Sequence, residues 1–182
     1  EPPADTNIQK EMSSKEIADL TLKNLVVIEP MNKNGKILGM GSGFFILPDV
    51  IATNAHVVAG AYALRIRYPN SQQNDMASEI VGIDRTTDLA LVRTKKFRSE
   101  NPLTLGNSDK ISVGSTIYNA GNPQGLEGTF TNGLVSNKQR FNGVEIVQIS
   151  APISQGSSGG PVLDSSGHVI GVSTAYLKTG QN

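Results

Sequence analysis

The sequence predicts an all-β protein of two β-barrels with a short N-terminal helix. Short apolar segments follow one another closely along the 182 residues, and they end at Gly, Asn or Pro. Helical periodicity nearly vanishes after residue 24, which favours barrels over a helical or parallel architecture. A charged segment with a proline, residues 95–102, interrupts the strand pattern, and we interpret it as the link between the barrels.

The N-terminal helix is predicted from its capping signal. Residues 1–12 are polar and contain two prolines, so we expect a loose arm there. Ser13 is followed three residues later by Glu16, which fits a capping box. The helix should run to about residue 24, with Ile17 and Leu20 on its apolar face. We therefore assign residues 1–24 to an arm and a short helix.

The two barrels are assigned to residues 25–97 and 98–182. Residues 54–58 should form one tight helical turn, and the polar residues 68–75 should form a hairpin loop. The strands expected in the first barrel are 25–28, 37–38, 43–47, 50–53, 63–67, 77–84 and 89–93. The strands expected in the second barrel are 115–120, 128–136, 145–150, 161–163 and 169–174.

Composition narrows the function classes. Lys plus Arg and Asp plus Glu both number 16, so the net charge is zero, and no basic stripe predicts binding to nucleic acid. The chain has no cysteine and only two, widely separated histidines, so we expect no metal site. No run of 18 apolar residues predicts a membrane span. The first residues lack the pattern of a signal peptide, which is compatible with an export signal that has been removed.

The most informative segment is Gly-Ser-Ser-Gly-Gly-Pro at residues 156–161. Glycines around Ser158 allow a turn that exposes its hydroxyl beside bare backbone N–H groups. In such a turn the N–H groups of Gly156 and Ser158 would form an oxyanion hole, which binds the negative oxygen of a tetrahedral intermediate. The alternative is a serine that serves only the turn chemistry of a Gly-rich hairpin.

A serine nucleophile needs a base, and the base needs an acid to orient it. Of the two histidines, His56 follows an apolar strand pair, whereas His168 lies in a hairpin turn and is assigned no role. Asp88 stands at the start of an apolar strand and is the leading acid. Asp84, four residues earlier, would point to the same face of a strand, so periodicity cannot separate the two.

The order of base, acid and nucleophile discriminates between folds. Residues 156–160 also match the Gly-x-Ser-x-Gly elbow of α/β-hydrolases, but in that fold the acid and the histidine follow the serine. Only Asp164 and His168 follow Ser158 closely enough here, and they lie in one short turn. No helix-forming segment follows the serine either, so this order disfavours the hydrolase fold.

The candidate residues lie in motifs that resemble the HtrA (Deg-type) branch of chymotrypsin-like serine proteases. The similarity runs from about residue 13 to about residue 175. It implies a chymotrypsin-like double β-barrel, with a triad of His56, Asp88 and Ser158 in the cleft between the barrels. The matching motifs are Gly-Ser-Gly-Phe at 41–44, Thr-Asn-Ala-His-Val-Val at 53–58, Thr-Asp-Leu-Ala-Leu at 87–91, Ala-Gly-Asn-Pro at 120–123, Gly-Leu-Val-Ser at 133–136 and the segment at 156–161.

The resemblance also implies a function. It implies a serine endopeptidase that needs no cofactor and hydrolyses unfolded or extended polypeptides in extracytoplasmic protein quality control, in the periplasm or after secretion. It is compatible with a homotrimer, which the family's N-terminal segment often mediates. Ile153, Thr174, Ala175 and Tyr176 would line the primary specificity pocket. Since none is charged, the pocket should prefer a small or medium aliphatic side chain, and Thr174 is expected to hydrogen-bond Asp88.

Three departures from the family pattern keep alternatives open. Ser157 stands where the family often has Asn, Gln155 replaces a frequent Pro, and no strand can be placed after residue 174 to close the second barrel. These departures leave open a resting loop with a collapsed oxyanion hole. The alternatives are a catalytically silent peptide-binding or chaperone-like module on the same fold, and a narrow-specificity secreted endopeptidase.

Overall fold

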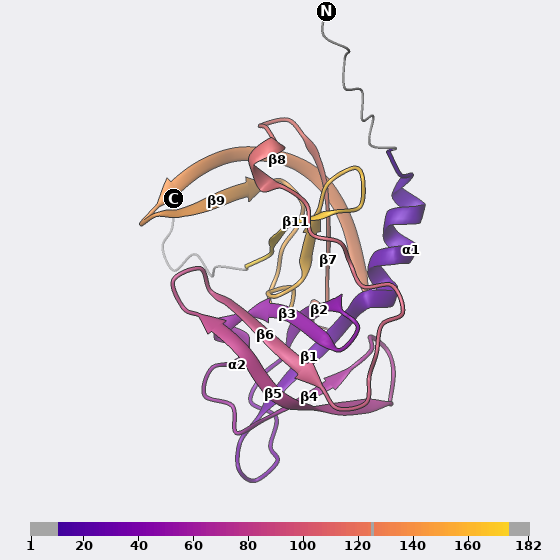
Figure 1. Ribbon diagram of the computed structural model, residues 1–182, viewed down its shortest axis with the longest axis vertical. Coiled ribbons are helices and arrows are strands. Elements are labelled where there is room, and N and C mark those ends of the chain that lie inside the picture. The colour runs from indigo at the N-terminus through magenta and orange to yellow at the C-terminus, as the bar shows by residue number, and fades with distance from the viewer. Residues whose placement is uncertain (1–10, 125, 175–182) are drawn as a thin grey trace, which may run out of the picture.

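The computed structural model describes residues 11–124 and 126–174, and these form a closed barrel beside an open sheet (Figure 1). The closed barrel joins its six strands in the order β1-β2-β3-β6-β5-β4. Those strands are β1 (Leu25–Met31), β2 (Gly41–Leu47), β3 (Val50–Asn54), β4 (Ala63–Arg67), β5 (Asn74–Asp84) and β6 (Leu89–Thr94). The open sheet has five strands in the order β11-β10-β7-β8-β9. Those strands are β7 (Thr116–Gly121), β8 (Thr129–Phe141), β9 (Val144–Ile149), β10 (Pro161–Leu163) and β11 (Val169–Val172).

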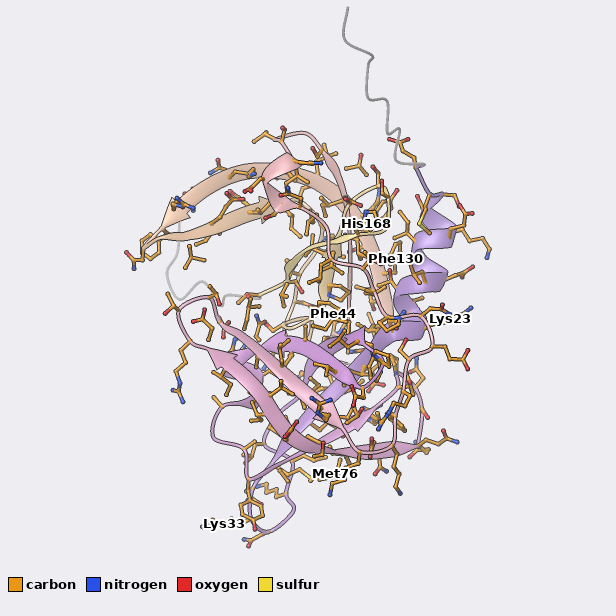
Figure 2. The ribbon with its side chains drawn as sticks, in the orientation of Figure 1. Lys23, Lys33, Phe44, Met76, Phe130 and His168 are labelled. Atoms are coloured by element: carbon orange, nitrogen blue, oxygen red, sulfur yellow. The ribbon has the colours of Figure 1, made fainter. Side chains whose placement is uncertain are left out.

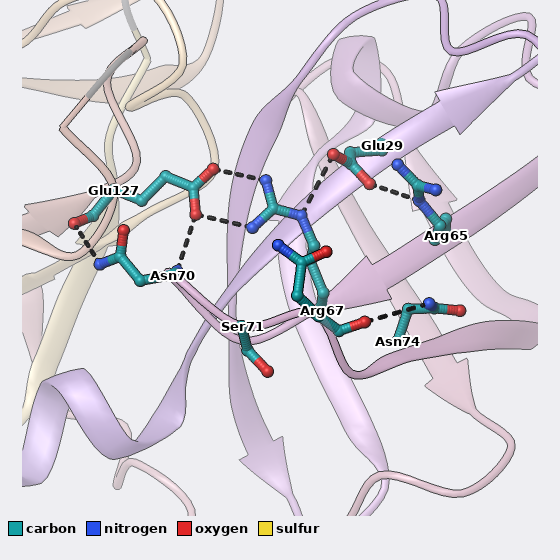
Figure 3. A pocket seen from close by; sticks show the side chains of 8 residues that line it. Glu29, Arg65, Arg67, Asn70, Ser71, Asn74 and Glu127 are labelled. Atoms are coloured by element: carbon teal, nitrogen blue, oxygen red, sulfur yellow. Dashed lines mark hydrogen bonds and ion pairs between the residues drawn. The ribbon is translucent and has the colours of Figure 1, made fainter.

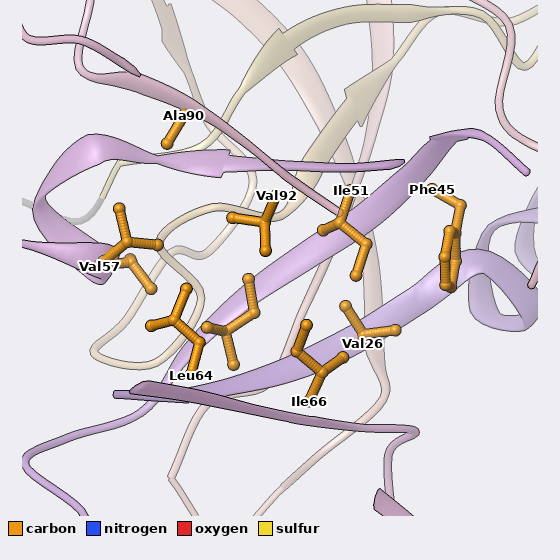
Figure 4. Close-up of a cluster of buried hydrophobic side chains, with 10 residues drawn as sticks. Val26, Phe45, Ile51, Val57, Leu64, Ile66, Ala90 and Val92 are labelled. Carbon is orange, nitrogen blue, oxygen red and sulfur yellow. The ribbon is translucent and has the colours of Figure 1, made fainter. Parts of the chain in front are cut away.

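The first barrel closes because β1 has a partner on both sides. Its residues pair antiparallel with β2 through Val26 and Gly43, and with β4 through Ile28 and Ile66. Closure leaves no unpaired strand edge. The interior is filled by branched and aromatic side chains, several of them shown in Figure 4. The buried cluster contains Val26, Ile28, Phe45, Ile51, Val57, Val58, Leu64, Ile66, Ala90 and Val92.

The second half contains the strands that the sequence predicts for the second barrel. Over the described residues it is an open sheet, with β11 at one edge and the long hairpin β8–β9 at the other. The predicted strand 128–136 is too short, since β8 continues to Phe141 and pairs with β9 from Val135 onward.

The N-terminal helix α1 (Ser14–Asn24) packs where the two halves meet. Ser13 caps it as predicted, because its hydroxyl accepts from the N–H of Glu16 while the Glu16 carboxylate accepts from the N–H of Ser13. Ile17 is fully buried in a cluster that also contains Phe44 of the first barrel and Tyr118 of the second sheet. Phe44 lies at this junction in Figure 2. No helix in the described ranges is long and apolar enough to cross a membrane.

Most predicted strands are found with their ends shifted by a few residues, and 63–67 and 161–163 have the observed bounds. The expected strand 37–38 is wrong, because only Ile37 forms an isolated bridge, to Met31. The tight helical turn expected at 54–58 is α2 (Ala55–Val58). The short 3-10 helix η1 (Ser108–Lys110) is not predicted by the sequence. The division of the barrels after residue 97 stays a prediction.

Candidate active site

The first barrel brings His56 and Asp88 together. His56 lies on α2, directly after β3, and Asp88 lies in the turn between β5 and β6. The His56 Nδ1 atom is 2.7 Å from the Asp88 Oδ2 atom, and the His56 backbone N–H donates to Oδ1 at 2.9 Å. The carboxylate therefore holds both the imidazole and the backbone of His56, as an orienting acid would. The side chains are 49% and 29% exposed, so the pair is open to substrate.

The backbone of Asp88 is held in an uncommon conformation. Its φ is 56°, in the left-handed region that Asp tolerates better than most side chains. Its carbonyl accepts from the Ala55 N–H at 3.0 Å and from the Asn54 side-chain amide at 3.0 Å. Asn54 is buried and donates also to Thr174 Oγ at 3.2 Å. The direct bond expected between Thr174 and Asp88 is therefore replaced, among the described residues, by one through Asn54.

The structure separates the two candidate acids that periodicity cannot. The Asp84 carboxylate accepts from the N–H of Thr86 at 2.8 Å and of Thr87 at 3.4 Å, inside its own turn. Hydrogen bonds from Thr87 and Thr86 lower the pKa of Asp84 below its ordinary value. Asp84 is thus a turn-forming carboxylate, whereas Asp88 contacts the imidazole.

Ser158 lies in a loop that only glycine can build. Gly156 and Gly159 flank it with φ of 95° and 91°. A Cβ at Gly159 would lie 2.1 Å from the carbonyl oxygen of Ser42, and a Cβ at Gly160 would lie 1.9 Å from that of Ala120. Both glycines therefore allow the loop to rest directly on neighbouring backbone. Ser158 itself is 7% exposed.

Gly41 lies between this loop and helix α2, which carries His56. A Cβ at Gly41 would lie 2.6 Å from Val57 Cγ1 and 3.3 Å from the carbonyl oxygen of Ser158. Val57 is the residue after His56 on α2. The first barrel and the Ser158 loop thus approach each other at Gly41, where a side chain would not fit.

Hydrogen bonds from neighbouring segments fix three carbonyl groups of this loop. The carbonyl of Gly156 accepts from the Ser42 hydroxyl at 2.7 Å, and that of Ser158 accepts from the Ser42 N–H at 2.8 Å. The carbonyl of Gln155 accepts from the Gln124 N–H at 3.3 Å. In a trans peptide the N–H points opposite to the C=O, so the Gly156 N–H points away from Gln124. An oxyanion hole needs that orientation.

Two residues of this site have no role assigned from the sequence, although both lie in motifs noted above. Ser42 is fully buried, and its hydroxyl accepts from the Asn122 N–H at 2.9 Å while it donates to Gly156. Asn122 is fully buried and donates from its side chain to the carbonyl of Val26 at 2.9 Å. The signal available was a polar residue between apolar or glycine neighbours, which indicates a buried hydrogen bond but not its partner.

The predicted pocket residues are only partly described. Ile153 is half-buried in the loop before Ser158, and Ala175 and Tyr176 lie outside the described residues. His168 lies in the turn between β10 and β11 (Figure 2), where its backbone N–H donates to Asp164 Oδ1 at 3.0 Å. Within residues 11–124 and 126–174, no three His, Cys, Asp or Glu side chains gather as a metal site.

Comparison with known proteins agrees with this geometry. A family model described as trypsin-like peptidase domain matches residues 41–172. The anti-sigma-I factor RsgI9 of Acetivibrio thermocellus is 33% identical over 94% of this chain and 24% of its own length. A probable periplasmic serine endoprotease, DegP-like, of Bartonella henselae is 36% identical over 77% of this chain and 28% of its own length. This chain therefore spans about a quarter of the length of these two relatives.

A solved structure has the same fold. The HtrA-type protease AlgW, determined with a tripeptide, superposes with a TM-score of 0.80 and 27% identity over 93% of this chain and 56% of that one. The chymotrypsin-like double-barrel architecture is thus confirmed, with the second barrel present as the open sheet described above.

Proposed function

The chain belongs to the trypsin-like peptidase family, among serine proteases of the Deg and HtrA type, and on that premise we propose that it hydrolyses peptide bonds with His56, Asp88 and Ser158. The observation that carries the proposal is the 2.7 Å contact between His56 and Asp88 on a barrel that also hydrogen-bonds to the Ser158 loop. His56 and Asp88 come from the first barrel, and Ser158 comes from the loop before β10 of the second half.

The proposed reaction is acyl transfer. The Ser158 Oγ attacks the scissile carbonyl carbon while His56 Nε2 takes the hydroxyl proton, and the N–H groups of Gly156 and Ser158 bind the oxyanion. Collapse of this intermediate breaks the C–N bond, and His56 returns the proton to the leaving amine. Water, deprotonated by His56, then attacks the acyl-enzyme and releases the acid and the free serine. Asp88 holds the imidazole tautomer and stabilises the imidazolium throughout.

Extended polypeptides are the proposed substrates. Strand β11 is an edge of the open sheet, and its residues after Val169 lead to Thr174 beside Asn54. An extended peptide can pair with such an edge strand by strand addition, whereas a folded protein has no free extended segment to add. Half-buried Ile153 and the other predicted pocket residues are uncharged, which favours an aliphatic side chain at the cleaved residue.

The setting that we propose is extracytoplasmic protein quality control, in the periplasm or after secretion. The support is the relative described as periplasmic and DegP-like, together with the preference for extended chains. A homotrimer built through residues 1–24 remains a proposal, which sedimentation equilibrium of the chain with and without this segment would test.

The experiment for this function compares one substrate in two states. A reduced, carboxymethylated protein should be cleaved, and its folded, disulfide-bonded form should not, with Ser158→Ala as the inactive control. Binding without cleavage by the wild type would instead support the silent peptide-binding module. Cleavage at a single sequence in both states would support a narrow-specificity endopeptidase.

A further inference from the structure

A bidentate ion pair joins the first barrel to the segment that precedes β8. Arg67, on β4, donates both terminal nitrogens to the Glu127 carboxylate, with Nη1 at 2.6 Å from Oε2 (Figure 3). Asn70, in the next loop of the same barrel, donates its backbone N–H to that carboxylate at 2.8 Å and its amide to the Glu127 carbonyl at 3.3 Å. Two residues of the first barrel therefore converge on Glu127.

Arg67 is itself fixed at the other end. Its Nε donates to Glu29, a buried residue of β1, at 3.2 Å, and Glu29 also accepts from Arg65 at 2.6 Å. These four charges line a hollow of about 550 Å³ and balance one another. Arg67 and Glu127 are both 17% exposed, so water screens their pair less than a surface pair. The pKa of Glu127 lies below its ordinary value, first because Arg67 donates to it.

Glu127 belongs to the same turn as Gln124, whose N–H donates to the Gln155 carbonyl in the Ser158 loop. Leu126 donates its N–H to the Pro123 carbonyl at 2.9 Å, and Gly128 donates to Asn122 Oδ1 at 3.0 Å. The turn so closed presents the Gln124 N–H to the Gln155 carbonyl. A Cβ at Gly156 would lie only 2.4 Å from the Asn122 carbonyl oxygen, so this turn and the loop are in direct contact.

We propose that Arg67 and Glu127 are positioning residues for the oxyanion hole. By tying residues 122–124 and 126–128 to the first barrel, they keep the Gln124 N–H against the Gln155 carbonyl and thereby the Gly156 N–H directed into the hole. Neither residue touches substrate. The inference rests on the proposed function, because it assigns the Gly156 N–H to the oxyanion. Arg65 provides a matched control, since it shares the strand, the hollow and Glu29 but does not contact Glu127.

The test measures acylation by a fluorophosphonate together with kcat and KM on a peptide. In Glu127→Ala we expect acylation and kcat to fall about tenfold, with KM changed less than twofold, because the substrate site is intact while the competent loop is less populated. Glu127→Gln, which keeps one acceptor, should fall between the wild type and Glu127→Ala. Arg65→Gln should stay within twofold of the wild type. Acylation of Glu127→Ala within twofold of the wild type would overturn the proposal.

Hydrogen exchange of residues 153–159 provides a readout that does not depend on activity. We expect it to accelerate in Glu127→Ala and to be unchanged in Arg65→Gln. If the wild type does not react with the probe, the proposed function fails, and exchange alone then decides the positioning role: unchanged exchange in Glu127→Ala overturns it. If Glu127→Ala does not fold, the same two readouts on Glu127→Gln and Arg67→Lys decide.

Discussion

The two halves of the molecule hold their parts of the site in different ways. In the first barrel, His56 and Asp88 are fixed by each other and by the adjoining backbone of α2. The loop of Ser158 in the second half is instead held from both halves. Ser42 of the first barrel donates to the carbonyls of Gly156 and Ser158. Ser173 and the turn containing Gln124 hold the loop from the second half. The proposed acid and base are therefore held within one barrel, whereas the proposed nucleophile and oxyanion hole depend also on how the halves dock.

This difference follows from the topology. A closed barrel with a continuous apolar interior positions residues at its strand ends without help from other segments. The glycines at 156, 159 and 160 let the loop of the open sheet contact neighbouring backbone closely. They also make the loop harder to order, because glycine loses more conformational entropy on folding than other residues.

The largest effect is expected from Asp88→Asn, which alters the first barrel's chemistry without altering its fold. Asn tolerates the positive φ of this position and keeps most hydrogen bonds, but it favours the wrong imidazole tautomer. Turnover should fall by up to ~10⁴ while the melting temperature changes little. Asp84→Asn is the matched control, and its turnover should stay close to that of the wild type. Equal losses in both variants would mean that Asp88 is not the acid.

Gly159→Ala should disrupt the docking of the second half. The new Cβ would meet the Ser42 carbonyl at 2.1 Å and would also need a left-handed backbone. We expect a loss of about 3 kcal/mol or more in the free energy of unfolding, from overpacking and conformational strain together. Gly143→Ala has a similar φ of 83° but open space around it, so its cost should be about 1–2 kcal/mol. Urea unfolding measures both, and similar costs would contradict the role of the close contact.

Substitution of two buried serines separates the support that the Ser158 loop receives from the first barrel and from the second half. Ser42→Ala removes the donor to the Gly156 carbonyl, whereas Ser173→Ala removes the donor to the Ser157 and Gly160 carbonyls. Each should cost about 1–3 kcal/mol of stability, because buried partners lose their bonds. We expect turnover to fall about 10-fold or more in Ser173→Ala, because the Ser157 carbonyl that it holds lies opposite the Ser158 N–H, a proposed oxyanion donor. The loss should be smaller in Ser42→Ala, because the Gly156 carbonyl lies opposite the Ser157 N–H. A larger loss of turnover in Ser42→Ala would reverse the comparison.

The smallest effect is expected in the dependence of folding stability on acidic pH, through Asp75 of the first barrel. Burial would raise the pKa of Asp75, but the N–H groups of Phe97 and Lys96 donate to its carboxylate and lower the pKa below its ordinary value near 3.8. The resulting stability is fully present above that ordinary value and is lost as the pH falls through the folded-state pKa. Asp75→Asn should therefore be less stable than the wild type at pH 7. The difference between their urea midpoints should shrink below pH 4, and a constant difference would contradict this.

The sequence predicted local structure better than contacts between distant segments. Strand patterns, the Ser13 capping box and the helical turn at His56 depend on neighbouring residues, so they could be read from the chain. The roles of Ser42 and Asn122 could not, because their partners lie 80 to 114 positions away. Periodicity failed to separate Asp84 from Asp88 for a related reason, since the turn rather than the strand directs each carboxylate.

The central claim is that the two halves together activate Ser158. Intact mass after reaction with a fluorophosphonate probe tests it most directly, with Ser158→Ala as the control. We predict one adduct per chain in the wild type and none in Ser158→Ala. A folded wild-type protein that acquires no adduct, or an adduct that persists in Ser158→Ala, would contradict the claim.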